Sequence, residues 1–95
     1  MGQLRKRAMA LAARIKKGDA EAAAELLAHS ISLGHRKLTA RRYFLAQAMD
    51  AVIPHEYARY CANILKHLPQ ESINIMMKEE QHRADLYMKR RRKDV

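Results

Sequence analysis

Two pairs of glutamate and histidine are the closest that this sequence comes to a metal-binding pattern. Glu79 and His82 form a Glu-x-x-His unit, which di-iron helical bundles use in two copies together with two further glutamates. This chain has one copy. Glu25 and His29 stand four residues apart, a spacing that allows a surface pair on a helix but falls short of a ligand set. We therefore expect neither a metal site nor a cofactor.

Cys61 could act as a nucleophile only with a base beside it and a lowered pKa. Its neighbours at helical spacing are Tyr57, Ile64 and Leu65, a pattern typical of a packed core thiol. The sequence also lacks a glycine-rich phosphate loop, a Cys-x-x-Cys motif and a serine in a nucleophile context. We therefore expect no enzymatic activity. A single cysteine also suits a reducing compartment, so we expect a cytoplasmic location.

The basic residues form the clearest pattern with chemical meaning. The chain of 95 residues has 19 Lys and Arg against 10 Asp and Glu, a formal net charge of +9. Most of the basic residues fall in three blocks, within residues 1–17, 34–48 and 81–95. Such blocks displace counterions from phosphates, which gives salt-sensitive and largely sequence-independent binding to DNA or RNA. The predicted nucleic-acid contacts are Arg5, Lys6, Arg7, Arg14, Lys16, Lys17, Arg36, Lys37, Arg41, Arg42, Lys89, Arg90, Arg91, Arg92 and Lys93.

The same charge leaves other partners open. The main alternative is an acidic protein surface, with this chain as an adaptor or inhibitor that docks on a larger assembly, including one encoded by a host. Aromatic and methionine anchors would then carry the binding energy. The candidate anchors are Tyr57, Tyr60, Met76, Met77 and Tyr87. Methionines on the last predicted helix also leave contact between copies of the chain open.

Membrane binding is not expected. No apolar stretch approaches the roughly 18–20 residues of a transmembrane helix. The first predicted helix places mostly alanine beside its charges, whereas a membrane-surface helix needs bulky apolar residues. We expect the basic N-terminal residues to be part of the folded domain rather than a targeting segment.

The elements that must position these residues are helices. Three glycines and two prolines are too few for a many-stranded fold, and the abundant alanine, leucine, lysine, arginine and glutamate favour helix. Gly18 and Gly34 predict the ends of the first two helices, and Asp19 predicts the N-cap of the second. Pro54 and Pro69 predict the starts of the fourth and fifth, because proline is tolerated at a first helical turn and disfavours helix in the residue before it.

The third helix is predicted to begin at Thr39, after a short loop over residues 35–38. Leu38 and Tyr43 are placed to form a hydrophobic staple across that cap. The helix would be the central core element, because it carries the widest apolar stripe in the chain. The stripe consists of Phe44, Leu45, Ala48, Met49, Val52 and Ile53.

The second and third helices, joined around Gly34, loosely suggest a helix-turn-helix. Ser30 stands where that motif usually has a small alanine, and His29 and His35 replace its buried apolar residues. A plain helical hairpin is the better interpretation. We therefore predict an all-α fold, a compact bundle of four to five short helices with a basic C-terminal helical extension. Residues 1–88 would form one domain and residues 89–95 a basic tail.

Overall fold

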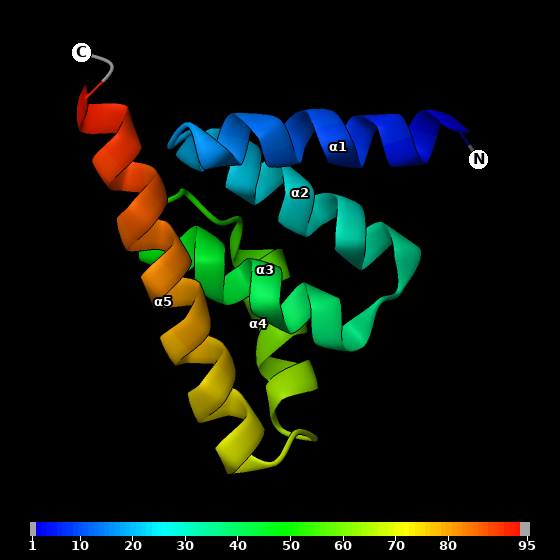
Figure 1. The fold of residues 1–95 in the computed structure, drawn as a ribbon. Coiled ribbons are helices and arrows are strands. Elements are labelled where there is room, and N and C mark those ends of the chain that lie inside the picture. Colours follow the sequence, from blue (N-terminus) through cyan, green and yellow to red (C-terminus); the bar gives the residue numbers. More distant parts are fainter. Residues whose placement is uncertain (1, 94–95) are drawn as a thin grey trace.

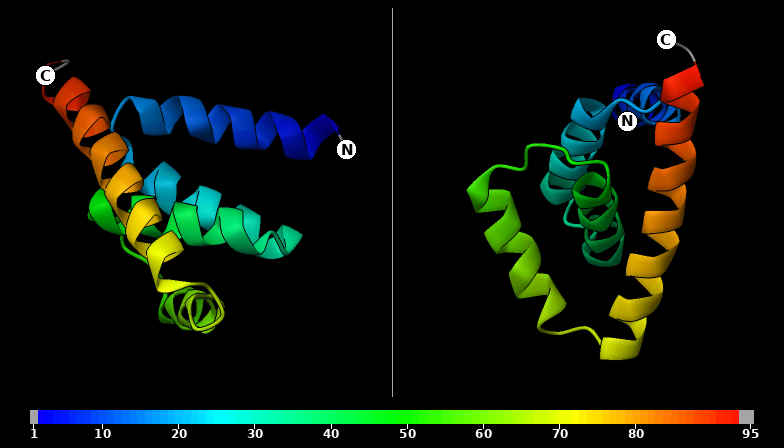
Figure 2. Two further views of the ribbon diagram at one scale, coloured as in Figure 1. Left: turned by 60° about the horizontal axis from the view of Figure 1, so that its bottom comes forward. Right: turned by 90° about the vertical axis from the view of Figure 1, so that its left-hand side faces the viewer.

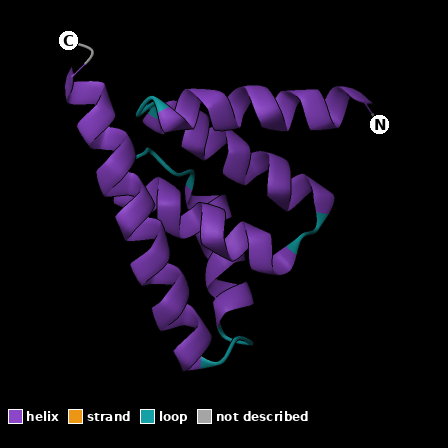
Figure 3. Ribbon diagram, viewed as in Figure 1, coloured by secondary structure: helices purple, strands orange, loops and turns teal. Residues whose placement is uncertain are grey.

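The computed structural model describes residues 2–93 and confirms the predicted all-α fold (Figure 1). Those residues form five helices and no strand (Figure 3). The helices are α1 (Gly2–Lys16), α2 (Ala20–Leu33), α3 (Arg36–Ala48), α4 (His55–Leu65) and α5 (Gln70–Lys93). Within the described part of the chain, no helix is long and apolar enough to cross a membrane.

The local signals between α1, α2 and α3 are confirmed. Gly18 has a φ of +91° and Gly34 a φ of +72°, the left-handed conformation in which a side chain is strained. Asp19 caps α2, because its side chain accepts a hydrogen bond of 3.1 Å from the backbone N–H of Ala22. This bond and the neighbouring Arg14 guanidinium lower the pKa of Asp19.

The start of α3 was predicted wrongly. Residues 36–38 are helical, and Thr39 lies buried inside the helix, where its backbone N–H donates to the carbonyl oxygen of His35 at 2.8 Å. Gly34 reverses the chain so sharply that the next helix begins almost at once, with His35 as its first flanking residue. Because Thr39 is not a cap, Leu38 and Tyr43 form no staple across one.

The end of α3 was also predicted too far along the chain. The helix ends at Ala48, and Asp50 has a positive φ of 58° that turns the backbone out of it. Residues 51–54 then run without helix to Pro54, whose ring disfavours helix in Ile53. Val52 is 89% exposed and does not belong to the core stripe. Pro54 and Pro69 stand directly before α4 and α5, as predicted.

The core consists of two clusters that meet on α3. One joins α1, α2, α3 and the middle of α5, and the other joins α3, α4 and the first half of α5. The predicted central position of the third helix is therefore confirmed, and Figure 2 shows α3 enclosed by the other helices. Alanine makes up much of the first cluster, which allows close helix approach. The buried members of the first cluster are Leu11, Ile15, Ala22, Ala23, Leu26, Leu45, Ala46, Met49 and Ala84. Those of the second are Ala40, Phe44, Ile64 and Met76.

Candidate functional site

The last turns of α5 lie against the turn that joins α1 to α2. The guanidinium of Arg91 donates a hydrogen bond to the carbonyl oxygen of Gly18 at 3.4 Å, across 73 residues of sequence. Tyr87 and Met88, about one helical turn earlier, pack against the first core cluster. The basic end of the chain is therefore held against the domain as a continuation of α5 and lies beside the basic end of α1 (Figure 1).

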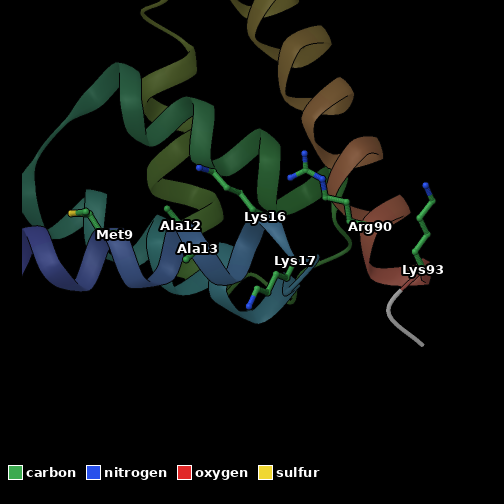
Figure 4. A pocket seen from close by; sticks show the side chains of 7 residues that line it. All are labelled: Met9, Ala12, Ala13, Lys16, Lys17, Arg90 and Lys93. Carbon is green, nitrogen blue, oxygen red and sulfur yellow. The ribbon is translucent and has the colours of Figure 1, made fainter.

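This packing creates a groove between the C-terminal ends of α1 and α5, which we call the basic groove (Figure 4). Its volume is about 610 Å³. The side of α1 contributes a small apolar floor, and the last turns of both helices contribute cations. The lining residues are Met9, Ala12, Ala13, Lys16, Lys17, Arg90 and Lys93.

The basic groove is purely cationic in its charged residues. Lys16 and Lys17 come from the end of α1, Arg90 and Lys93 come from the end of α5, and no carboxylate lines the groove. In residues 2–93 none of these four side chains takes part in an ion pair. All four residues are exposed, so an anion in solution can reach each of them. The groove therefore presents positive charge that no carboxylate of its lining balances.

Arg7 and Arg14, by contrast, are paired within the domain. The Arg14 guanidinium lies 2.9 Å from the Asp19 carboxylate and 3.9 Å from that of Glu25, which Arg7 approaches at 4.0 Å. The hydrogen bond to Asp19 and its charge raise the pKa of Arg14 further above its usual value. These two arginines hold α1 to the start of α2, and much of their charge is balanced locally.

Arg41 is also paired, in a network between α3 and α5. Its guanidinium lies 3.2 Å from both Glu79 and Glu80, and Arg83 approaches the Glu80 carboxylate at 3.0 Å. Glu80 is only 2% exposed. A buried carboxylate requires such partners, because an unpaired charge there would lack its hydration. Arg41 thus positions α5 on α3.

The remaining predicted nucleic-acid contacts lie in two separate places. Arg5, Lys6, Arg36 and Lys37 are exposed at the start of α1 and the start of α3, and Arg42 is partly buried on α3. Lys89 and Arg92 are exposed on the last turns of α5 beside the basic groove. The three sequence blocks therefore do not form one surface: the first block is divided between the two ends of α1.

The residues expected to anchor a protein partner differ in their burial. Met76 is buried in the second core cluster, Tyr57 and Tyr87 are partly buried, and Tyr60 and Met77 are exposed. Met76 therefore serves the core.

Cys61 is fully buried, which confirms the predicted core thiol. Burial raises the pKa of this thiol to about 11, so little reactive thiolate is present near neutral pH. Across residues 2–93, no group of three or more His, Cys, Asp or Glu side chains is placed to hold a metal ion.

Sequence reasoning missed Met9 and a set of exposed leucines, because their roles depend on neighbours far away in the chain. It also missed Arg83, whose partner Glu80 lies only three residues away but is buried by the packing of α5 on α3. Comparison with protein-family models, with curated proteins and with solved structures finds no match to this chain.

Proposed function

We propose that this protein is a small accessory or regulatory protein that binds nucleic acid through the phosphate backbone, with the basic groove as its main contact. One observation carries the proposal. Four unpaired cations, drawn from the C-terminal ends of α1 and α5, line one groove that contains no carboxylate. We place this binding in the cytoplasm, where a free thiol such as Cys61 persists.

The energetics of the groove support an anionic ligand. Cations in a last helical turn stabilise their own helix by roughly 0.3–1 kcal/mol through the helix dipole. That effect explains Lys16 and Lys93 separately, but it does not favour bringing the two helix ends together. Like charges around one groove repel each other, and a phosphodiester chain would relieve that repulsion.

The groove favours backbone contact over base reading. Its cations are three lysines and one arginine on exposed helix ends, and such side chains bind phosphate as charges without selecting a base. We therefore expect similar affinity for unrelated sequences of equal length.

The test is a binding titration with fluorescein-labelled duplex DNA, single-stranded DNA and structured RNA over a salt series. If the four groove cations each neutralise one duplex phosphate, the slope of log affinity against log salt is roughly −3.6. This slope corresponds to a loss of affinity of about 150-fold between 50 and 200 mM salt. Negligible binding to all three probes near physiological salt would contradict the proposal.

A pair of charge-matched variants separates the groove from net charge. The triple variant Lys16→Gln, Lys17→Gln, Arg90→Gln removes two lysines and one arginine from the groove. Its control removes the same residue types from exposed positions elsewhere, with Arg59→Gln, Lys66→Gln and Lys78→Gln. We expect the groove variant to flatten the salt slope by roughly 2.7 and the control to change it little. Equal losses would mean that binding follows overall charge and not the groove.

A further inference from the structure

A second hollow lies at the other end of α1, and three leucines line it. Leu4 of α1, Leu33 of α2 and Leu38 of α3 are 49%, 40% and 38% exposed. With Ala8 they surround a hollow of about 320 Å³, which we call the leucine hollow. Single exposed leucines are common on protein surfaces. Here three of them, from three helices, face one concave site and form an apolar patch, which is typical of an interaction site.

The rim of the leucine hollow is positive. Arg5, Arg42, His29 and His35 complete its lining, and no Asp or Glu belongs to it. Arg42 is partly buried, and loss of water lowers the pKa of its guanidinium. Among residues 2–93 no carboxylate lies within ion-pair distance of Arg42. Arg42 is thus a partly desolvated cation beside an apolar hollow. A carboxylate of another molecule could form an ion pair with it there.

We infer that the leucine hollow is a docking site for an acidic amphipathic helix of a protein partner. Apolar side chains of that helix, spaced three and four residues apart, would fill the hollow between Leu4, Leu33 and Leu38. Its carboxylates would pair with Arg5 and Arg42 at the rim. This site is separate from the basic groove, and the inference does not depend on nucleic-acid binding.

The chemistry of the hollow favours a protein over the other occupants. Bases stack most strongly on the large rings of Phe, Tyr and Trp, and none of these side chains lines the hollow. A second copy of this chain carries a net charge of +9 and would bring like charge to a positive rim. An acidic amphipathic helix can pack apolar side chains against the three leucines and can also pair its carboxylates with the two arginines.

The first measurement uses a synthetic helical peptide with leucine at every third or fourth position and glutamate between. Its control is a peptide of the same composition with the leucines scrambled. We expect the first peptide to bind by fluorescence polarisation and to shift the methyl resonances of Leu4, Leu33 and Leu38 in NMR spectra of the full chain. Equal binding of the scrambled peptide, or shifts confined to Ile75 and Leu86 on α5, would overturn the inference.

Matched variants test the leucines. The double variant Leu33→Ser, Leu38→Ser removes half-exposed apolar surface from the hollow. Ile75→Ser, Leu86→Ser removes comparable surface from α5, where these side chains are 51% and 43% exposed. We expect the first variant to weaken peptide binding about tenfold or more and the second to change it less than twofold. Thermal unfolding by circular dichroism verifies that both variants remain folded. Equal effects of the two variants on binding would overturn the inference.

Removal of a rim charge tests the predicted ion pairs. Arg42→Gln should weaken peptide binding and reduce its salt dependence. Arg36→Gln changes an exposed position on the same helix and should do neither.

The same NMR spectra decide between occupants of the leucine hollow. Stronger shifts of the three leucine methyls with an oligonucleotide would assign the hollow to nucleic acid, and shifts that depend on protein concentration alone would assign it to a second copy. Either result would overturn the proposed partner.

Discussion

Arg91 leaves no room for a side chain on Gly18. A β-carbon built on Gly18 would lie 2.5 Å from the β-carbon of Arg91 and 3.0 Å from the backbone carbonyl oxygen of Tyr87. The close approach brings the end of α5 to the end of α1 and so forms the basic groove. A glycine that the sequence marks only as a helix terminator is therefore also the contact point between two distant basic segments.

Gly18→Ala should separate these segments without changing any charge. The left-handed φ at this position costs a non-glycine residue about 1–2 kcal/mol, and the clash with Arg91 adds about 1–3 kcal/mol more. Gly34→Ala is the matched control, because Gly34 also has a left-handed φ but a β-carbon there meets nothing within 4 Å. Urea unfolding should show the larger loss for Gly18→Ala, and duplex DNA affinity should fall only in that variant. Equal losses in both variants would contradict the docking of α5 on this turn.

Glu80→Gln should destabilise the protein far more than Glu79→Gln. Both carboxylates lie 3.2 Å from Arg41, but Glu80 is buried and also pairs with Arg83, while the Glu79 side chain is about half exposed. Removing the buried charge leaves Arg41 with only the exposed Glu79 as an ion-pair partner and removes the carboxylate that pairs with Arg83, which we expect to cost about 2 kcal/mol. The exposed pair should contribute less than about 0.5 kcal/mol. Chemical denaturation of both variants measures the difference, and similar values would show that the network does not stabilise α5 on α3.

Asp19→Ala should cost about 1 kcal/mol at pH 7, because the cap of α2 is lost. The pKa of Asp19 is lowered from its usual 3.8, first by the hydrogen bond from Ala22. Its carboxylate therefore stabilises the fold fully above pH 3.8, and this contribution is lost as the pH falls through the lower folded-state pKa. Asp19→Asn retains a capping oxygen and serves as the control. Unfolding free energies measured from pH 7 down to pH 2 should show the wild type losing its advantage over both variants, while the difference between Asp19→Asn and Asp19→Ala stays unchanged. A wild-type advantage that does not change with pH would contradict this assignment.

Cys61 should resist alkylation in the folded protein. The rise of its pKa from 9.0 to about 11 lowers the thiolate fraction near pH 8 by about 100-fold, and burial restricts access further. Iodoacetamide labelling followed by mass spectrometry should be slow in buffer and fast in urea. The comparison thiol is Ser32→Cys in a Cys61→Ala background, since residue 32 is exposed. Equal labelling rates for the two thiols in buffer would show that α4 opens readily.

The sequence by itself determined the features that depend on near neighbours in the chain. Gly18, Gly34, Asp19 and the two prolines mark helix ends through interactions that span only a few residues, so their patterns can be recognised without the fold. The same holds for the burial of Cys61, which follows from the apolar face of one helix. The sequence misplaced Thr39 and extended α3 to Ile53, because residues 49–53 are as apolar as a helix stripe and nothing local showed the positive φ at Asp50.

Only the tertiary structure decided which charges are free. Arg41 and Arg90 look alike in the sequence, yet Arg41 pairs with glutamates 38 and 39 residues away, while Arg90 lies in a groove without carboxylates. The leucine hollow likewise requires α1, α2 and α3 to meet at one end. Such relations depend on which helix packs on which, and that packing is set by the summed fit of many buried side chains rather than by any local pattern.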